Sequence, residues 1–276
     1  MQEAYGTHLL RLGYQDRANF LPLLYPLKAG WALPESPWKL EVSHDTPEHL
    51  LAGLLGGDLD AAFISTAALT QHSRQIAPLR GWGLAVEGAT ETALILAPQR
   101  LDLVDGRSIS VSEEAQGSTA AYLMRTLLTP YYGISLTIRA AGDTEGTAED
   151  ARLLYGDSAA LEATKQPEGA VAEDLGKAWF ILSGLPMVWE MLAVPRDLDE
   201  RKPGAGESLH ALITRSQRAA QEQQSTILDE AATRLGLKKE RVKELFARQK
   251  YALGEKEQKG LAYFLDQAAR SGVLPR

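Results

Sequence analysis

The sequence contains no cysteine among its 276 residues. Disulfides, thiolate zinc sites, iron–sulfur clusters and cysteine nucleophiles are therefore excluded. Apolar runs are also short: none approaches the roughly 20 residues that cross a bilayer, so we expect no membrane partner. Basic residues are outnumbered, with 29 Lys and Arg against 36 Asp and Glu and a formal net charge of −7. Because this balance repels a phosphate backbone, nucleic acid is not an expected partner.

Local motifs of several enzyme classes are missing as well. The five histidines are scattered, and the closest pair, His44 and His49, lies on the two sides of a predicted turn, which is not a metal-ligand spacing. The nucleophile elbow of serine hydrolases and the glycine-rich loops of nucleotide-binding proteins do not occur. We therefore expect neither a metal ion nor a cofactor. The first residues lack the basic region and the apolar core of a secretory signal, which predicts a cytoplasmic protein.

The first two thirds of the chain alternate short apolar runs with helical patterns, which is typical of an α/β fold. Strands are predicted over residues 9–13, 38–42 and 60–64. The helix after the second strand is the clearest, because Thr46 provides an N-cap and Pro47 suits the first helical position. A glycine pair then ends it.

Two later apolar runs indicate a second lobe. Residues 92–97 and 187–194 each run up to a proline and predict strands that cross between the lobes. Because the segments between these runs form a further α/β pattern, we expect lobe 2, residues 92–195, to be inserted into lobe 1, residues 1–91 and 196–276.

The tail of the chain differs in pattern from the rest. A cluster of helix-breaking residues at 201–206 precedes it, and almost no strand signal follows. Apolar residues recur at steps of three and four, which predicts amphipathic helices over 207–235, 239–249 and 255–271. The tail is expected to pack on the first lobe, with a separate helical module as the alternative.

Small polar residues follow several predicted strands, at points where open α/β sheets bind ligands. The amide of Asn19 could hold a carboxylate or hydroxyl, or could cap a turn. Asp157 could cap the next helix or face the cleft. Hydroxyls and one glycine open two further helices, where they could hold an anion or only cap the helix. These residues are Ser65, Thr66, Gly117, Ser118 and Thr119. Helix starts spread over two lobes predict a small polycarboxylate bound between them.

Motifs distributed over residues 9–265 resemble one known family. They are Gly13 with Asn19 and Pro22-Leu23 after it, Gly57-Asp58-Leu59-Asp60 before Ala61–Ile64, Leu153–Ala159, Asp174–Trp179, Gly184–Val188, and Tyr251-x-Leu253-Gly254. Together they resemble chorismate dehydratase of the futalosine route to menaquinone. Two positions depart from that pattern: Arg17 stands where the family usually has Tyr, and Thr92 stands where it usually has Ser.

The resemblance implies a two-lobed α/β fold like that of type II periplasmic binding proteins, with crossing strands and a C-terminal helical segment. It also implies a lyase that dehydrates chorismate to 3-[(1-carboxyvinyl)oxy]benzoate in the cleft between the lobes, without cofactor or metal. Asn19 and Thr92 are then the expected catalytic residues. The expected substrate-binding residues are Asn19, Ser65, Thr66, Thr92, Gly117, Ser118, Thr119 and Asp157.

Two other functions stay open at this point: the sister 1,4-dihydroxy-6-naphthoate synthase of the same route, and a small-anion receptor without chemistry. The identity of the general base that accepts the proton from the substrate is open as well. Neither Asn19 nor Thr92 titrates near neutral pH, so the proton must go elsewhere. Asp157, His44 and the substrate's own carboxylate are the candidates. We favour the last, because positioning can replace a dedicated base when the reacting groups share one molecule.

Overall fold

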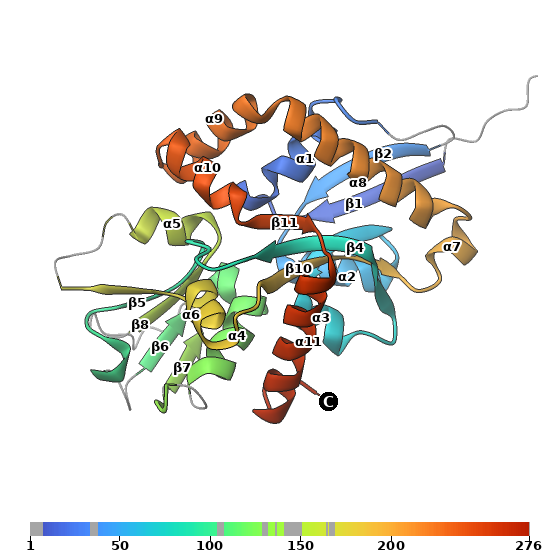
Figure 1. Ribbon diagram of the computed structural model, residues 1–276. Coiled ribbons are helices and arrows are strands. Elements are labelled where there is room, and N and C mark those ends of the chain that lie inside the picture. The colour runs from blue at the N-terminus through green and yellow to red at the C-terminus, as the bar shows by residue number, and fades with distance from the viewer. Residues whose placement is uncertain are drawn as a thin grey trace, which may run out of the picture.

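The computed structural model of the chain consists of two β-sheets with helices packed around them (Figure 1). It describes residues 8–33, 38–103, 108–128, 132–135, 137–140, 151–163, 165 and 169–275. The larger sheet has the strand order β11-β4-β10-β3-β1-β2, and the smaller sheet has the order β7-β6-β8-β5-β9. The predicted α/β class is confirmed. The first seven residues, on which the expectation about a signal rests, lie outside the described residues.

The larger sheet contains the three strands predicted near the N-terminus. β1 is parallel to β2 and β3, β10 is antiparallel to β3 and β4, and β11 is antiparallel to β4. β3 and β10 are buried along their whole length, as expected for central strands covered on both faces. The strands are β1 (His8–Tyr14), β2 (Trp38–His44), β3 (Ala61–Ser65), β4 (Ile76–Val86), β10 (Met187–Pro195) and β11 (Gln249–Ala252).

Two strands of this sheet are missing from the sequence prediction. β4 contains a proline and two glycines, which interrupt its apolar pattern, and Gly83 is required there because a Cβ would lie 2.5 Å from the backbone oxygen of Glu190. β11 has only four residues and lies in the tail, a region with almost no strand signal in the sequence. The predicted helix 239–249 ends at Ala247 because Gln249 pairs with Val86 of β4.

Three helices follow the first three strands of the larger sheet along the chain: α1 (Leu21–Lys28), α2 (Pro47–Gly56) and α3 (Thr66–Gln71). The Thr46 side chain accepts a hydrogen bond from the His49 backbone N–H at 3.3 Å, and Gly57 ends α2 at a φ of 84°. The predicted cap and stop of this helix are therefore confirmed.

The smaller sheet is built mainly from the middle of the chain. β5 is antiparallel to β8 and β9, and β6 is parallel to β7 and β8. Its strands are β5 (Ala93–Ala97), β6 (Ser108–Val111), β7 (Thr137–Ala140), β8 (Ala151–Tyr155) and β9 (Val171–Asp174). Its helices are α4 (Thr119–Leu128), α5 (Asp157–Ala163) and α6 (Leu175–Ser183), and the 3-10 turns of the chain are η1 (Ala18–Phe20), η2 (Leu101–Leu103) and η3 (Glu113–Ala115).

The tail forms five helices in addition to β11. The single helix predicted over 207–235 is wrong, because Gln223 leaves the helical conformation with φ −110° and ψ 28° and divides it. No glycine or proline at that point signals the break. The helices are α7 (Leu198–Arg201), α8 (Ala205–Glu222), α9 (Gln224–Leu235), α10 (Lys239–Ala247) and α11 (Glu255–Arg270).

The position of β10 bears on where the second lobe ends. The predicted lobe 2, residues 92–195, includes this strand, whereas β10 pairs with β3 and β4 of the larger sheet. The chain therefore returns to the larger sheet before β10 begins. We propose a shorter inserted lobe that ends at residues 184–186.

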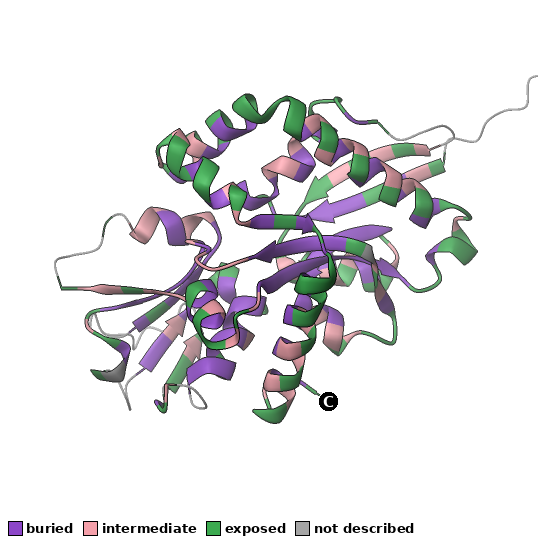
Figure 2. Cartoon of the chain, in the orientation of Figure 1, coloured by how far each residue is buried: buried purple, intermediate pink, exposed green. Residues whose placement is uncertain are grey.

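Helix α11 joins the two parts of the molecule. It packs against β10, and its residues Tyr263 and Phe264 lie 5.5 and 6.0 Å, between ring centroids, from Trp179 of α6. Figure 2 shows buried residues throughout the central strands of both sheets. Within the described part of the chain, no helix has both the length and the apolar character needed to cross a membrane.

A Gly260→Ala substitution is expected to destabilise the protein by about 1 to 3 kcal/mol, since an added Cβ would lie 2.2 Å from the Pro186 backbone oxygen and push α11 away from β10. Gly56→Ala is the matched control in α2, because the Cβ added there would lie 3.8 Å from an Asp58 oxygen, at ordinary contact distance. Helix propensity alone favours alanine at both positions. Equal urea midpoints for the two variants would contradict this account of α11.

Candidate functional site

Most of the predicted site residues meet where the two sheets face each other. Several hydrogen bonds cross this junction, and three of them join predicted site residues to one another. Asn19 Nδ2 donates to Thr92 Oγ1 at 3.1 Å, and the Thr66 backbone N–H donates to Thr119 Oγ1 at 3.0 Å. Ser65 Oγ donates to the Gly117 backbone oxygen at 2.9 Å. Residues up to 73 positions apart in the sequence are thereby brought into one interface.

The amide of Asn19 is buried, with 4% of the residue exposed, and is held from both sides. Its Oδ1 accepts from Gln249 Nε2 at 3.2 Å, opposite the bond to Thr92, whose hydroxyl also lies 2.8 Å from Thr90 Oγ1. Tyr251 Oη donates to the Asn19 backbone oxygen at 2.6 Å, and burial raises the pKa of Tyr251. The Asn19 side chain thus links Thr92, directly before β5, to β11 instead of capping a helix.

Sequence reasoning does not identify Gln249 and Tyr251 as parts of this site. Both lie on β11, about 230 residues from Asn19 in the sequence. The motif Tyr251-x-Leu253-Gly254 is the one signal in the sequence that points to this segment.

The two predicted helix starts are tied to β10 and to each other. Thr66 Oγ1 donates to the Val188 backbone oxygen at 2.9 Å, and Thr119 Oγ1 donates to that of Trp189 at 2.5 Å. Ser65 also accepts from Ala68 N and so caps α3. Ser118 differs from the others, because its hydroxyl donates to the Ala115 backbone oxygen at 2.7 Å within its own lobe.

Asp157 lies at the start of α5 and joins it to the other lobe. Its two oxygens accept from the Ala18 backbone N–H at 3.0 and 3.2 Å, and Arg234 Nε of α9 donates to one of them. Arg234 also pairs with Asp16 at 3.0 Å. Burial raises the pKa of Asp16, but the Arg234 guanidinium outweighs burial and holds that pKa below its ordinary value. Asp157 therefore links α5 to the other lobe, and Asp16 helps to hold the Arg234 side chain that binds it.

A buried ion pair, Arg17 with Glu190, lies in the same interface. Arg17 Nη2 donates to Glu190 Oε1, and Tyr155 Oη donates to the same oxygen at 3.2 Å. Glu190 is 1% exposed and Arg17 is 7% exposed. In the sequence, the signals for this pair are one acidic residue inside the apolar run 187–194 and the departure from the family pattern at Arg17.

A groove of about 760 Å³ opens between the lobes. Its walls come from the carboxyl ends of β1 and β2, the start of α2, and η3 on the opposite side. Among the described residues that line it, Arg17 is the only lysine or arginine, while five are acidic. The lining residues are Gln15, Asp16, Arg17, His44, Asp45, Thr46, Pro47, Glu48, His49, Glu113, Glu114 and Gln116.

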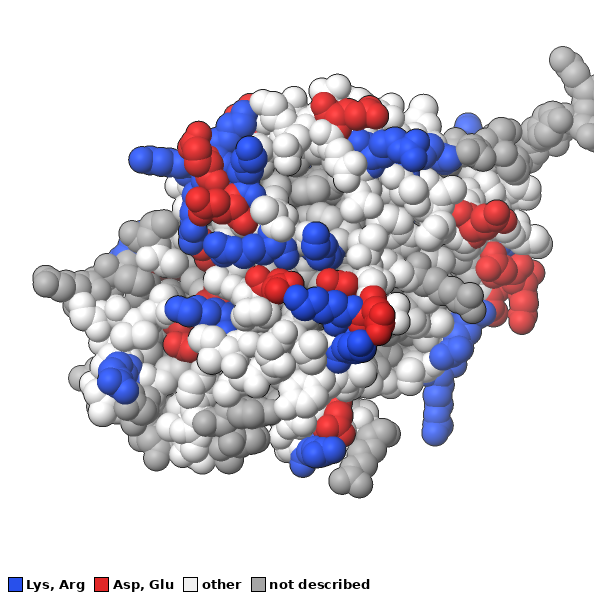
Figure 3. All heavy atoms as spheres, in the orientation of Figure 1, with Lys and Arg blue, Asp and Glu red and all other residues white. Residues whose placement is uncertain are grey.

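Charges on the molecular surface are mixed. On the face shown in Figure 3, acidic and basic side chains are interspersed. The described chain also contains ion pairs such as Lys239 with Asp229 and Lys256 with Glu87, both at 2.7 Å. The described residues on that face form no extended basic surface of the kind that a phosphate backbone needs.

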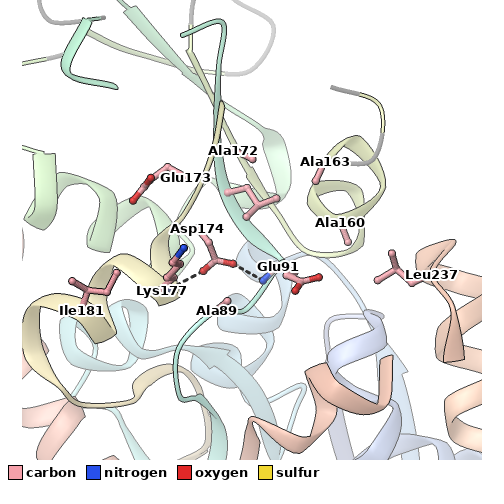
Figure 4. A pocket seen from close by; sticks show the side chains of 11 residues that line it. Ala89, Glu91, Ala160, Ala163, Ala172, Glu173, Asp174, Lys177, Ile181 and Leu237 are labelled. Carbon is pink, nitrogen blue, oxygen red and sulfur yellow. Dashed lines mark hydrogen bonds between the residues drawn. The ribbon is translucent and has the colours of Figure 1, made fainter. Parts of the chain in front are cut away.

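A second cavity, of about 510 Å³, lies beside the segment that leads into β5 (Figure 4). Asp174 stands in it between Glu91 and Lys177, whose backbone N–H groups donate to its carboxylate at 2.7 and 2.9 Å. Burial raises the pKa of Asp174, and the N–H bonds counteract it. This carboxylate caps α6 and fixes the connecting segment, so we assign it a structural role.

Solved structures of low sequence identity have the same architecture. Protein AF1704 of Archaeoglobus fulgidus gives a TM-score of 0.76 at 19% identity, covering 98% of this chain and 100% of that one. The alkanesulfonate-binding protein SsuA of Xanthomonas axonopodis pv. citri, bound to MOPS, gives 0.68 at 16%, with coverages of 97% and 94%. The CA3427 gene product of Candida albicans, described as having the generic periplasmic binding protein fold, gives 0.69 at 14%, with coverages of 97% and 91%. The chain therefore has the periplasmic-binding-protein fold, as predicted.

The family follows from the sequence itself. The chain belongs to the menaquinone biosynthesis family, whose model matches residues 10–270. The resemblance carried by the motifs is thus confirmed at the level of the family, and the protein has a role in menaquinone biosynthesis.

Proposed function

We propose that the protein is a carbon–oxygen lyase that removes water from chorismate and forms 3-[(1-carboxyvinyl)oxy]benzoate, an early step of the futalosine route. The observation that carries the proposal is the buried amide–hydroxyl pair of Asn19 and Thr92, which joins the two lobes at 3.1 Å. Membership in the menaquinone biosynthesis family supports it.

The chemistry of this dehydration suits a neutral donor. The reaction breaks the bond from a ring carbon to its hydroxyl, removes the proton of the neighbouring ring carbon that bears the ether, and leaves an aromatic ring. Negative charge develops on the departing oxygen, and a preorganised N–H donor stabilises it. Gln249 fixes the Asn19 amide so that Nδ2 faces Thr92. When a ligand separates this pair, Asn19 Nδ2 donates to the departing hydroxyl.

The proton acceptor in this proposal is a carboxylate of the substrate. Asp157 is engaged by Arg234 and by the Ala18 backbone N–H, which argues against its acting as a base. His44 lines the groove and is the remaining protein candidate. An intramolecular carboxylate needs only correct positioning, which the closed lobes supply.

The main rival is a receptor that binds a small anion without chemistry, since a neighbour of the same fold is the alkanesulfonate-binding protein bound to MOPS. An incubation of chorismate with protein at a much lower molar concentration separates the candidates. A dehydratase converts all of it to an aromatic acid; a receptor raises its own melting temperature but leaves chorismate intact. The sister synthase does not convert chorismate, and chorismate is not required for its reaction. Persistence of chorismate at prolonged incubation would contradict the proposal.

The acidic rim of the groove is expected to slow capture of a doubly charged anion. Replacing Glu113 and Glu114 of η3 with glutamine should lower KM for chorismate by roughly two- to fivefold at low salt, and the gain should vanish above about 0.5 M salt because of screening. Glu200→Gln with Glu207→Gln removes the same charge from α7 and α8 and is the control. An equal change of KM in both double variants would refute entry of the substrate past η3.

A further inference from the structure

The Arg17–Glu190 pair is asymmetric in its hydrogen bonding. Arg17, Gln15 and Tyr155 all donate to Glu190 Oε1, with Gln15 Nε2 at 3.3 Å. Glu190 Oε2 is buried and has no partner among the described residues, and neither have Nε and Nη1 of Arg17. Of the three guanidinium nitrogens of Arg17, Nη2 alone is thus bonded to a described residue.

Such an arrangement leaves a strong binding group unused. A guanidinium carries five N–H donors in a planar fork that matches the two oxygens of a carboxylate. Buried donors without a partner are unfavourable, so this fork favours the arrival of an external acceptor. The group is also held in place: Arg17 Cζ lies 4.6 Å from the ring centroid of Tyr155 and 5.4 Å from that of Phe20.

Arg17 is placed next to the proposed reaction site and borders the groove between the lobes. Its stem lies against Gly156, where a Cβ would be 2.9 Å from Arg17 Cδ, and the Gly156 N–H donates to the Thr92 backbone oxygen at 2.8 Å. Arg17 also lines the groove between the lobes. The one permanent cation among the described lining residues therefore stands at the inner wall of an otherwise acidic groove.

We propose that Arg17 is the binding group for one carboxylate of the ligand, and that Glu190 holds and neutralises the guanidinium until the ligand enters. This inference rests on the proposed function only for the identity of the ligand, since any small carboxylate of the same shape would be bound in this way. Glu190 is a positioning residue here, and it also weakens anion binding, because the ligand meets a neutral pair and not a free cation.

Two variants should change affinity in opposite directions. Glu190→Gln keeps the size and an oxygen acceptor for Arg17 but removes the negative charge, and is expected to tighten binding of benzoate and of 3-[(1-carboxyvinyl)oxy]benzoate by about tenfold. Arg17→Gln combined with Glu190→Gln removes both charges together, which avoids leaving a buried carboxylate unpaired. This double variant is expected to weaken both ligands by about tenfold or more relative to the wild type.

Dissociation constants from titration calorimetry, with circular dichroism to check folding, measure these effects. A structural ion pair predicts lower stability in the variants but no opposite changes of affinity. Dissociation constants that stay unchanged, or that change in the same direction in both variants, would overturn the inference. So would a failure of both benzoate and 3-[(1-carboxyvinyl)oxy]benzoate to bind the wild type and Glu190→Gln. If the double variant does not fold, the result for Glu190→Gln alone decides. Turnover of chorismate by the wild type is measured in parallel, so that the two proposals can be tested separately. Turnover together with unchanged dissociation constants rejects only the role of Arg17. Opposite changes of affinity in the two variants without turnover by the wild type reject only the dehydratase activity.

Discussion

Asn19→Asp should reduce turnover of chorismate by about a hundredfold or more, the scale seen when one preorganised donor is lost. Aspartate has nearly the size of asparagine but cannot donate from the position of Nδ2, which bonds to Thr92 in the structure. It also places a negative charge beside an anionic substrate. Steady-state kinetics measures the loss, and circular dichroism confirms that the variant is folded.

The control for this variant is Gln221→Glu, the same amide-to-acid change on an exposed position of α8, which should leave turnover unchanged. A role of Asn19 as a helix cap predicts the opposite result, because aspartate caps helices about as well as asparagine. A folded Asn19→Asp enzyme with near-normal turnover would remove Asn19 from the reaction.

Thr119→Val should lower the free energy of unfolding by about 2 to 6 kcal/mol, one of the largest losses expected for a change of nearly constant volume. The hydroxyl is fully buried and serves two backbone groups: it donates to the Trp189 oxygen and accepts from the Thr66 N–H. Valine leaves both groups buried without this partner, at a cost of about 1 to 3 kcal/mol each. Urea denaturation measures the difference.

Thr126→Val provides the matched control on the same helix. The Thr126 hydroxyl donates only to the Tyr122 backbone oxygen one turn earlier at 2.8 Å, so its loss affects no contact between the lobes. Thr119→Ser, which keeps the hydroxyl, should recover most of the stability. Equal losses for Thr119→Val and Thr126→Val would show that the hydroxyl of Thr119 does not hold the lobes together.

Local chemistry explains why part of the fold is predictable. The apolar runs that become β1, β2 and β3 are short, bounded by turns and followed by helical periodicity, and α2 has its cap and its terminating glycine in the sequence. By contrast, β4 forms because it pairs with β10. Register shifts in this pairing accommodate the proline and the glycines of β4. β11 forms because β4 offers an edge to pair with. Such tertiary pairing has no local signal.

The same distinction holds for the site. Helix starts such as Ser65-Thr66 and Ser118-Thr119 are visible as hydroxyls after strands, and the motifs indicate Asn19 and Thr92. Which of them touch depends on how the two lobes pack, and the Ser118 hydroxyl donates to the Ala115 backbone oxygen of its own lobe. Arg17 and Glu190 are 173 positions apart, and the pairing of β10 with β3 and β4 brings the glutamate into the interface.

The most direct test of the central claim is the identity of the product formed from chorismate. Mass spectrometry and comparison with authentic 3-[(1-carboxyvinyl)oxy]benzoate should show a compound lighter than chorismate by one water, with its ether and both carboxylates intact. Its rate of formation should be proportional to the concentration of the wild-type enzyme. The Asn19→Asp variant should form it about a hundredfold more slowly or worse. Chorismate recovered unchanged after incubation with folded wild-type protein, or converted to a product without the ether, would contradict the assignment.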